Sequence, residues 1–333
     1  MTERPSPLRP LVAIVGPTAV GKSEVALILA ERLNGEIVSA DSRQIYRGMD
    51  IGTAKPTPEE RARVPHHLID VTDPDRPLTL AEYQRMAYAA IEEIHRRGRL
   101  PFLVGGTGLY VWAVVEGWQI PPAPPDPALR RALEERAQRE GPGALYEELR
   151  RLDPEAAARI DPRNLRRVIR ALEVCYRTGQ PFSAQRRKSP PPYATIMIGL
   201  TRPREELYRR IDERVERMIA AGLIEEVRRL AERYPWELPA MTGLGYRQIG
   251  AYLRGEISLE EAIRRIRSAT RAFVHHQYNW FRLEDPRIRW FDLSRVGVED
   301  IEAWLREELA RRLREAAPAG PAQKPSPSPE SSG

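Results

Sequence analysis

The sequence predicts an α/β protein in which a parallel sheet is flanked by helices and joined to an all-helical segment. Up to residue 108, short apolar runs alternate with helical patterns, which is typical of strands connected by crossover helices. The alternation stops at the proline-rich run 121–127, and beyond it only helical periodicity is found as far as residue 177. A glycine-containing loop ending in Gly-Lys-Ser joins the first apolar run to the first helical pattern.

The first elements follow from apolar runs and turn residues. We expect a buried strand over Leu11–Val15, a helix over Lys22–Leu33 that ends near Asn34 and Gly35, and a second strand over Glu36–Ala40. A short third strand is expected over His67–Val71.

A capping box and a glycine turn mark the next two elements. Thr79 followed by Glu82 predicts the start of a helix that runs to about Arg97. Pro101–Val104 predicts a strand, and Gly105–Gly108 predicts a turn before another helix. Ligands of parallel sheets collect where strands end, so the Gly-Lys-Ser loop, Asp41–Gln44 and Gly105–Gly108 are expected to converge there.

The second half of the chain predicts a helical insertion and then a return to the sheet. A strand-like run, Ala194–Leu200, follows a second proline break at 189–192. Ser258 with Glu261 predicts a capping box for a helix to about Arg282, with an apolar stripe at helical spacing. The stripe contains Ile263, Ile266, Thr270, Phe273 and Phe281.

These patterns divide the chain into four parts, one of which consists of two segments. We expect an α/β core with C-terminal helices over 10–120 and 193–315, and a helical insertion domain over 121–192. Residues 1–9 and the Pro, Ser, Ala and Gly-rich tail 316–333 are expected to be disordered.

The loop after the first strand has the residues of a phosphate-binding loop. It consists of Gly16, Pro17, Thr18, Ala19, Val20, Gly21, Lys22 and Ser23. Glycines let backbone N–H groups approach an anion, Lys22 adds a positive charge, and the Ser23 hydroxyl can hold a Mg²⁺ ion. The sequence therefore predicts a P-loop NTPase-like core that binds a diphosphate or triphosphate.

Composition limits the class of protein. The chain has one cysteine, which excludes a disulfide framework and a cysteine-rich zinc module. No apolar stretch reaches the length of a membrane span, and Met1–Pro10 lacks the apolar core of a signal peptide, so we expect a cytoplasmic protein without membrane contact. The net charge of +6 is compatible with a polyanionic partner, but only four of the 53 basic residues are lysines, a bias that GC-rich coding or heat adaptation also explains.

Asp41 has two interpretations from the residues alone. A carboxylate at a strand end beside a phosphate loop is either a structural cap or metal partner, or a general base facing a nucleophile.

A longer string resembles a known family. Val38–Pro56 reads VSADSRQIYRGMDIGTAKP and is similar to the signature of the tRNA dimethylallyltransferases, also called IPP transferases. Four further segments resemble the same family in the same order: Pro65–Asp70, Leu103–Tyr110, Arg166–Val174 and Gly243–Gln248. Members transfer a dimethylallyl group from dimethylallyl diphosphate to the exocyclic amine of the adenine 3′ of the tRNA anticodon, releasing diphosphate.

The resemblance implies roles for individual residues. Thr18–Ser23 would hold the diphosphate with Mg²⁺ on Ser23, Arg214 would contact the diphosphate, and Asp41 would accept the adenine amine proton. The catalytic set is therefore Asp41, Thr18 and Arg214. The helical insertion would clamp the anticodon stem–loop, and we expect a monomer. The positions that match tRNA contacts are Asp41, Ser42, Arg43, Gln44, Thr107, Arg130, Arg166, Arg167, Val168, Ile169, Arg170, Gly243, Leu244, Gly245, Tyr246, Arg247 and Gln248.

Three rival functions share parts of this pattern. A P-loop kinase for nucleotides or small molecules explains the loop but not the Val38–Pro56 string. An NTP-dependent RNA-binding protein predicts hydrolysis without a covalent product, and a nucleotide isopentenyltransferase would use a free adenosine phosphate as acceptor. His275 and His276 stand where the family more often has Lys-Arg, and as neighbours on a helix they are not expected to form a metal site.

Overall fold

The computed structural model describes residues 9–121, 125–185, 188–189, 191 and 193–316. These residues divide into two compact units, an α/β unit and a helical unit. The α/β unit contains the described residues of Met1–Pro77, Ala90–Gly108 and Pro192–Gly333, and the helical unit contains those of Leu78–Ala89 and Leu109–Pro191. The segments expected to be disordered lie outside the described residues, except that Arg9 begins the first strand and Ala316 ends the last helix.

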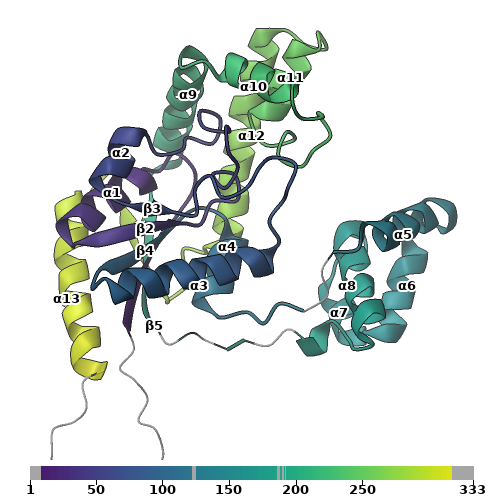
Figure 1. The fold of residues 1–333 in the computed structure, drawn as a ribbon, viewed down its shortest axis with the longest axis horizontal. Helices are drawn as coiled ribbons and strands as arrows, with labels where there is room; N and C mark the ends of the chain where they lie inside the picture. The colour runs from purple at the N-terminus through teal and green to yellow at the C-terminus, as the bar shows by residue number, and fades with distance from the viewer. Residues whose placement is uncertain (1–8, 122–124, 186–187, 190, 192, 317–333) are drawn as a thin grey trace, which may run out of the picture. The chain divides into compact units, whose positions relative to one another are not determined.

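A six-stranded parallel sheet forms the centre of the α/β unit, in the order β3-β2-β4-β1-β5-β6 (Figure 1). Residues Leu11–Val15 of β1 are completely buried, because β1 lies between β4 and β5 and both faces of the sheet are covered. This explains why the strand reads as a continuous apolar run. The strands are β1 Arg9–Val15, β2 Gly35–Ser39, β3 His66–His67, β4 Leu100–Val104, β5 Tyr193–Thr201 and β6 Ile288–Asp292.

Two strands differ from the expectation. The third strand was expected to reach Val71 but ends at His67, because Leu68 and Asp70 adopt left-handed backbone conformations with φ of 62° and 57°. Strand β6 was not predicted, although it buries Ile288 and Phe291 and pairs with β5 from Met197 and Ile288 onward.

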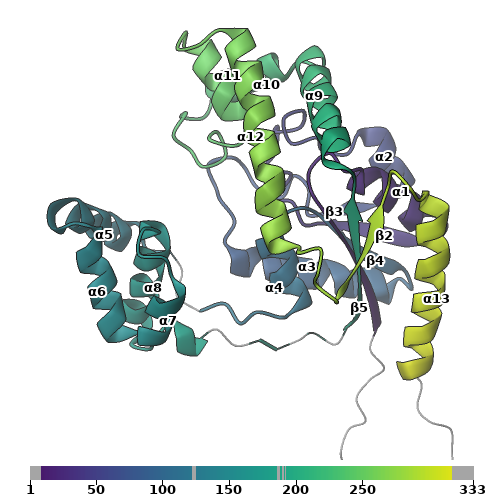
Figure 2. The ribbon, with the colours of Figure 1, turned by 180° about the vertical axis from the view of Figure 1, so that it is seen from behind.

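Helices α1 and α13 pack side by side against this sheet, as both views show (Figure 2). Helices α9 to α12 form a second group in the same unit, in which α12 packs on α9 and α11. The helices of the α/β unit are α1 Lys22–Arg32, α2 Pro58–Arg63, α9 Arg204–Ala220, α10 Leu223–Ala231, α11 Tyr246–Leu253, α12 Leu259–Trp280 and α13 Val298–Ala316. None of the helices in the described part of the chain is long and apolar enough to cross a membrane.

Helix α12 corrects two details of the predicted pattern. The Ser258 hydroxyl accepts a hydrogen bond from the Glu261 amide, but the Glu261 side chain binds Arg265 instead of closing a capping box. Phe273 belongs to the predicted apolar stripe, yet it is 42 % exposed, while its neighbour Val274 is buried. The buried face of α12 therefore includes Val274 in place of Phe273.

The helical unit contains no strand of three or more residues within its described part, as the periodicity predicts. Prolines begin three of its helices, and the side chains of Asp126 and Asp153 cap two of them. Leu145, Leu149 and Leu172 lie in its completely buried core. Its helices are α4 Gly108–Val115, α5 Pro127–Glu140, α6 Pro142–Leu152, α7 Pro154–Arg159, α8 Leu165–Thr178 and the 3₁₀ turn Ser183–Gln185.

Helix α3 Leu80–Arg96 is divided between the two units after Ala89. The capping box predicted at its start, between Thr79 and Glu82, is present.

Candidate active site

The phosphate loop connects the carboxyl end of β1 to the start of α1, as predicted. Gly16 has φ of 142°, and a Cβ atom added there would lie 2.4 Å from the carbonyl oxygen of Leu200 in β5. A larger residue is therefore excluded by both conformation and space. Gly21 occupies the N-cap position of α1, so the loop ends at the positive pole of that helix.

Cations hold the carbonyl groups of this loop. The Lys22 ammonium donates to the carbonyl oxygens of Gly16 and Pro17, at 3.0 and 2.7 Å. Arg210 donates from Nε to the Ala19 carbonyl at 2.9 Å.

Arg202 adds a further contact by donating from Nε to the Val20 carbonyl at 3.0 Å. In a peptide group the C=O and N–H point in opposite directions, so this bond aims the Gly21 N–H away from Arg202. Arg202 and Arg210 were not among the predicted site residues, because nothing in the sequence distinguishes them from the many other arginines of the chain.

Lys22, Arg214 and Asp41 lie close enough for their charges to interact. Burial and the neighbouring Arg214 lower the pKa of Lys22 from 10.5 to about 7, while Asp41 opposes this change. Burial lowers the pKa of Arg214, and Asp41 again acts in the opposite direction. The structure thus brings together three residues that are distant in sequence: a lysine of the loop, an arginine of α9 and the aspartate that follows β2.

The turn after β4 lies beside Asp41 because β4 separates β1 from β2 in the sheet. Thr107 donates its amide N–H to the Ala40 carbonyl at 3.2 Å, and its hydroxyl accepts the Ser42 amide N–H at 3.0 Å. One carboxylate oxygen of Asp41 accepts the Arg43 amide N–H at 2.8 Å. Asp41 therefore does have a structural contact, and its second carboxylate oxygen is the one that a general base would use.

A side chain from α12 joins the phosphate loop to this turn. Gln277 is 4 % exposed; its amide oxygen accepts the Thr18 amide N–H at 2.7 Å, and its amide nitrogen donates to the Gly106 carbonyl at 3.1 Å. Gln277 directly follows His275 and His276 and was not among the predicted site residues.

Gln44 and Arg43 are anchored inside the α/β unit. Gln44 accepts a hydrogen bond from Ser39 and donates to the carbonyl oxygen of Ala54, at 3.0 and 3.2 Å. Arg43 donates to the Pro239 carbonyl at 2.8 Å, which places the Asp41–Gln44 segment next to the loop that precedes α11.

The Gly243–Gln248 segment combines buried and exposed side chains. Tyr246 is buried and donates its hydroxyl hydrogen bond to Glu226 at 2.6 Å, and Gln248 accepts the Gly245 amide N–H at 3.0 Å. Arg247 is exposed. Tyr246 and Gln248 thus shape this segment, and the Arg247 side chain is its cationic group available to a partner.

Glu226 also explains part of the Val38–Pro56 string. Its buried carboxylate accepts the amide N–H groups of Asp50, Ile51 and Gly52, at 2.7 to 3.1 Å. Three amide donors around one carboxylate fix the conformation of this loop.

The arginines predicted to contact tRNA in the helical unit fall into two classes. Arg130 and Arg170 are paired with the buried carboxylate of Glu173, Arg130 through bonds of 3.0 and 2.8 Å and Arg170 at 2.5 Å. Arg166 and Arg167 are exposed at the start of α8. The exposed pair is therefore better placed to meet phosphate groups.

The two apolar residues of the same predicted set are buried. Val168 and Ile169 belong to the core of the helical unit, with exposed fractions of 0 % and 4 %. Their side chains hold α8 in place.

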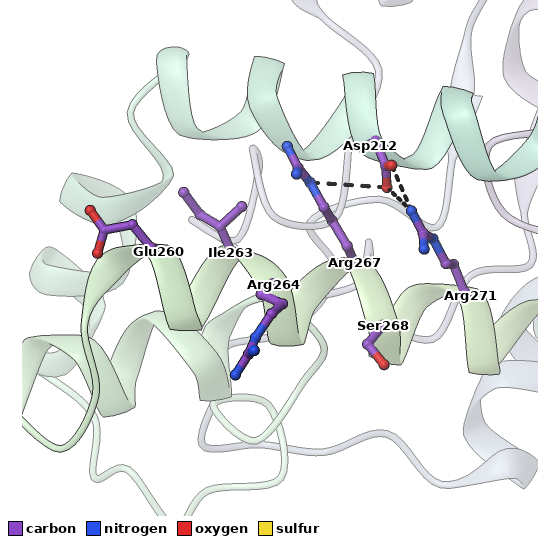
Figure 3. Close-up of a pocket in the computed structure, with 7 residues that line it drawn as sticks. All are labelled: Asp212, Glu260, Ile263, Arg264, Arg267, Ser268 and Arg271. Carbon is purple, nitrogen blue, oxygen red and sulfur yellow. Dashed lines mark hydrogen bonds and ion pairs between the residues drawn. The ribbon is translucent and has the colours of Figure 1, made fainter.

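A cavity of about 460 Å³ lies between α9 and α12. Asp212 lies at its wall and forms ion pairs with Arg267 and Arg271 (Figure 3). No residue of the phosphate loop or of the strand ends lines it, so we do not assign it to the reaction site.

Metal ligands are sparse. Among the described residues, no group of three or more His, Cys, Asp or Glu side chains could hold a metal ion. His275 and His276 are exposed, and His275 contacts the Tyr208 hydroxyl at 3.3 Å. Ser23, exposed at the start of α1, supplies a hydroxyl oxygen beside the phosphate loop.

Comparison with known proteins identifies the relatives of this chain. A family model described as IPP transferase matches residues 44–284, and one described as isopentenyl transferase matches residues 10–73. A tRNA dimethylallyltransferase of Thermomicrobium roseum is 56 % identical over 94 % of this chain and 94 % of its own length. One from a Roseiflexus species is 61 % identical over 82 % of this chain and 90 % of its own.

Solved structures agree with this result. A full-length tRNA isopentenylpyrophosphate transferase from Bacillus halodurans has a TM-score of 0.69 and 45 % identity, covering 92 % of this chain and 98 % of that one. A eukaryotic dimethylallyltransferase acting on tRNA has a TM-score of 0.79 and 26 % identity, covering 91 % and 80 %. These relatives do not favour the kinase or NTP-dependent alternatives. On the family match, the identity and the shared P-loop-like α/β fold, the chain belongs to the IPP transferase family.

Proposed function

We propose that this protein transfers a dimethylallyl group from dimethylallyl diphosphate to the N6 amine of the adenine at tRNA position 37, next to the anticodon. The observation that carries the proposal is the convergence of Lys22, Arg214 and Asp41 at the carboxyl ends of β1 and β2. Two cations beside one carboxylate suit a reaction in which an anion departs while a proton is removed.

The reaction balances with these groups. The N6 nitrogen forms a bond to C1 of the dimethylallyl group, the bond from C1 to the diphosphate oxygen breaks, and the N6 proton passes to Asp41. Lys22, Arg214 and the amides of the phosphate loop stabilise the charge that develops on the departing diphosphate. Thr107, whose hydroxyl holds the Ser42 amide, would position the adenine beside Asp41.

The Ser23 hydroxyl at the start of α1 would supply one protein oxygen to a Mg²⁺ ion, and the diphosphate and water would supply the other ligands. When bound, the ion would neutralise charge on the diphosphate.

Contacts to the tRNA would come from both units. Arg166, Arg167 and Arg247 are the exposed cations of the predicted set, and the helical insertion 121–192 would hold the anticodon stem–loop. Arginine suits this role because it pairs with phosphates and stacks on unpaired bases. We further propose that the protein acts as a monomer in the cytoplasm, where it would meet tRNA.

Mass spectrometry of a modified RNA tests the proposal. An unmodified anticodon stem–loop is incubated with the protein, Mg²⁺ and dimethylallyl diphosphate, in parallel with ATP in place of the prenyl donor. The matched control is a stem–loop with guanine at the target position. A five-carbon addition only to the adenine RNA is expected; ATP consumption without that addition would favour a kinase or NTPase instead.

A second acceptor separates the proposal from a nucleotide isopentenyltransferase. Adenosine monophosphate replaces the stem–loop under the same conditions. We expect no prenylation of the free nucleotide, because the exposed arginines of both units would have no RNA backbone to bind.

A further inference from the structure

Gln277 is the side chain that links the two halves of the site. It comes from α12, far along the chain, and both ends of its amide are used: the oxygen on Thr18 of the phosphate loop and the nitrogen on Gly106. Its exposed fraction of 4 % means that water cannot readily replace either partner.

Gly106 leads directly to the proposed base. The next residue, Thr107, holds Ser42 through its hydroxyl and Ala40 through its amide, and these two residues flank Asp41. A shift of Gly106 is therefore transmitted to the carboxylate, while a shift of Thr18 moves the diphosphate.

We propose that Gln277 is a positioning residue that sets the distance between the bound diphosphate and Asp41. This inference rests on the proposed function. It also assigns a role to Thr18: the amide N–H is taken by Gln277, so Thr18 acts on the diphosphate through its hydroxyl.

The contacts require an amide of this length. The side chain must accept at one end and donate at the other, which glutamine does and an ionised glutamate cannot. A side chain at position 106 would displace this amide, because a Cβ atom on Gly106 would lie 2.2 Å from the Gln277 amide nitrogen.

The test compares Gln277→Ala and Gln277→Glu with the unaltered protein. In Gln277→Ala, kcat/KM for dimethylallyl diphosphate should fall about 10- to 100-fold at a temperature where the variant is folded, because the reacting groups lose their alignment. In Gln277→Glu the ionised carboxylate faces the Gly106 carbonyl, whereas the protonated form restores one acceptor and one donor. Its activity relative to the unaltered protein should therefore rise as the pH is lowered, and that of Gln277→Ala should not.

Tyr278→Phe is the matched control for general loosening of α12. It removes the neighbouring hydrogen bond between the Tyr278 and Thr201 hydroxyls, 2.8 Å apart, without touching the phosphate loop. The thermal midpoint of each variant is measured at every pH used. Tyr278→Phe is expected to keep kcat/KM within about twofold of the unaltered value, as expected for a bond outside the reacting groups.

Two results would overturn the inference. One is near-normal kcat/KM in Gln277→Ala; the other is a loss of activity in both Gln277 variants that is independent of pH and follows their thermal midpoints as in Tyr278→Phe.

Calorimetry with inorganic pyrophosphate separates this inference from the proposed function. Weaker pyrophosphate binding in Gln277→Ala, restored at low pH in Gln277→Glu, would support the positioning of the phosphate loop by Gln277, even if the unaltered protein transferred no prenyl group. In that case only the proposed function would be refuted. Unchanged pyrophosphate binding in both variants would overturn the link between Gln277 and the phosphate loop.

Discussion

Diphosphate binding should weaken as the pH rises through the pKa of Lys22. Burial and Arg214 lower this pKa from 10.5 to about 7. The difference corresponds to about 5 kcal/mol of added cost for charging the lysine, compared with a lysine in water. A bound diphosphate provides the opposite charge and raises the pKa again, so binding and protonation of Lys22 favour each other.

The size of the effect follows from the fraction of charged lysine. With a pKa of about 7, roughly nine tenths of empty sites carry charged Lys22 at about pH 6, and roughly one tenth at about pH 8. If the complex keeps Lys22 charged, the dissociation constant of pyrophosphate should be about tenfold larger at the higher pH, and binding there should take up nearly one proton per site.

Titration calorimetry in two buffers with different ionisation enthalpies measures that proton directly. Lys22→Arg is the control, because a guanidinium stays charged over this pH range. Proton uptake by this variant therefore comes from the titration of pyrophosphate itself and contains no contribution from residue 22. The unaltered protein should take up nearly one proton more than Lys22→Arg at about pH 8. Equal proton uptake by the two proteins would refute the reasoning.

Arg214→Met provides an independent check of the cause. Since Arg214 lowers the Lys22 pKa, its removal should shift the pH at which pyrophosphate affinity declines to higher values, even though overall affinity falls. If the midpoint of this pH dependence does not change, Arg214 is not a cause of the lowered Lys22 pKa.

Three further predictions follow from named contacts. Asp41→Asn keeps the oxygen that accepts the Arg43 amide N–H but removes the base. The value of kcat should therefore fall about 10²- to 10⁴-fold, while the affinity for the stem–loop, measured by filter binding, stays nearly unchanged. Normal turnover would exclude Asp41 as the base. Arg166→Ala should weaken stem–loop binding and make it less dependent on salt, with little change in thermal midpoint, because Arg166 is exposed. Arg170→Ala should lower the thermal midpoint because it disrupts an ion pair with the buried carboxylate of Glu173. The reverse pattern would contradict the assignment of Arg166 to RNA binding and of Arg170 to stability. Gly106→Ala should reproduce the kinetic defect of Gln277→Ala, because the added methyl group displaces that side chain, and a fully active variant would argue against the close contact.

Elements with strong local signals were predicted well. Strand β1 and helix α1 agree with the expectation to within two residues, because a wholly buried strand and a glycine-bounded helix leave clear patterns. The convergence of the phosphate loop, Asp41 and the Gly105–Gly108 turn was also predicted, since parallel strands present their carboxyl ends at one edge. Strand β6 was missed because a five-residue edge strand among long helices carries a weak signal.

The tRNA-contact positions remain predictions, and the structure refines how each could act. Val168, Ile169 and Tyr246 are buried, so their side chains support the segments that carry the exposed arginines. A motif match does not distinguish a supporting residue from a contacting one, because both are constrained by the same local fold.

Residues that lie close together in the chain were enough to predict the loop ending in Gly-Lys-Ser, the α/β and helical segments and the resemblance to the IPP transferase family. The distant side chains that complete the candidate site could be found only from the three-dimensional packing. Gln277 contacts Thr18, from which it is separated by 259 positions in the sequence, and Arg202 and Arg210 contact the carbonyl groups of the loop. These contacts arise because α9 and α12 pack near the ends of the strands in the folded protein. No periodicity or spacing in the sequence indicates this packing.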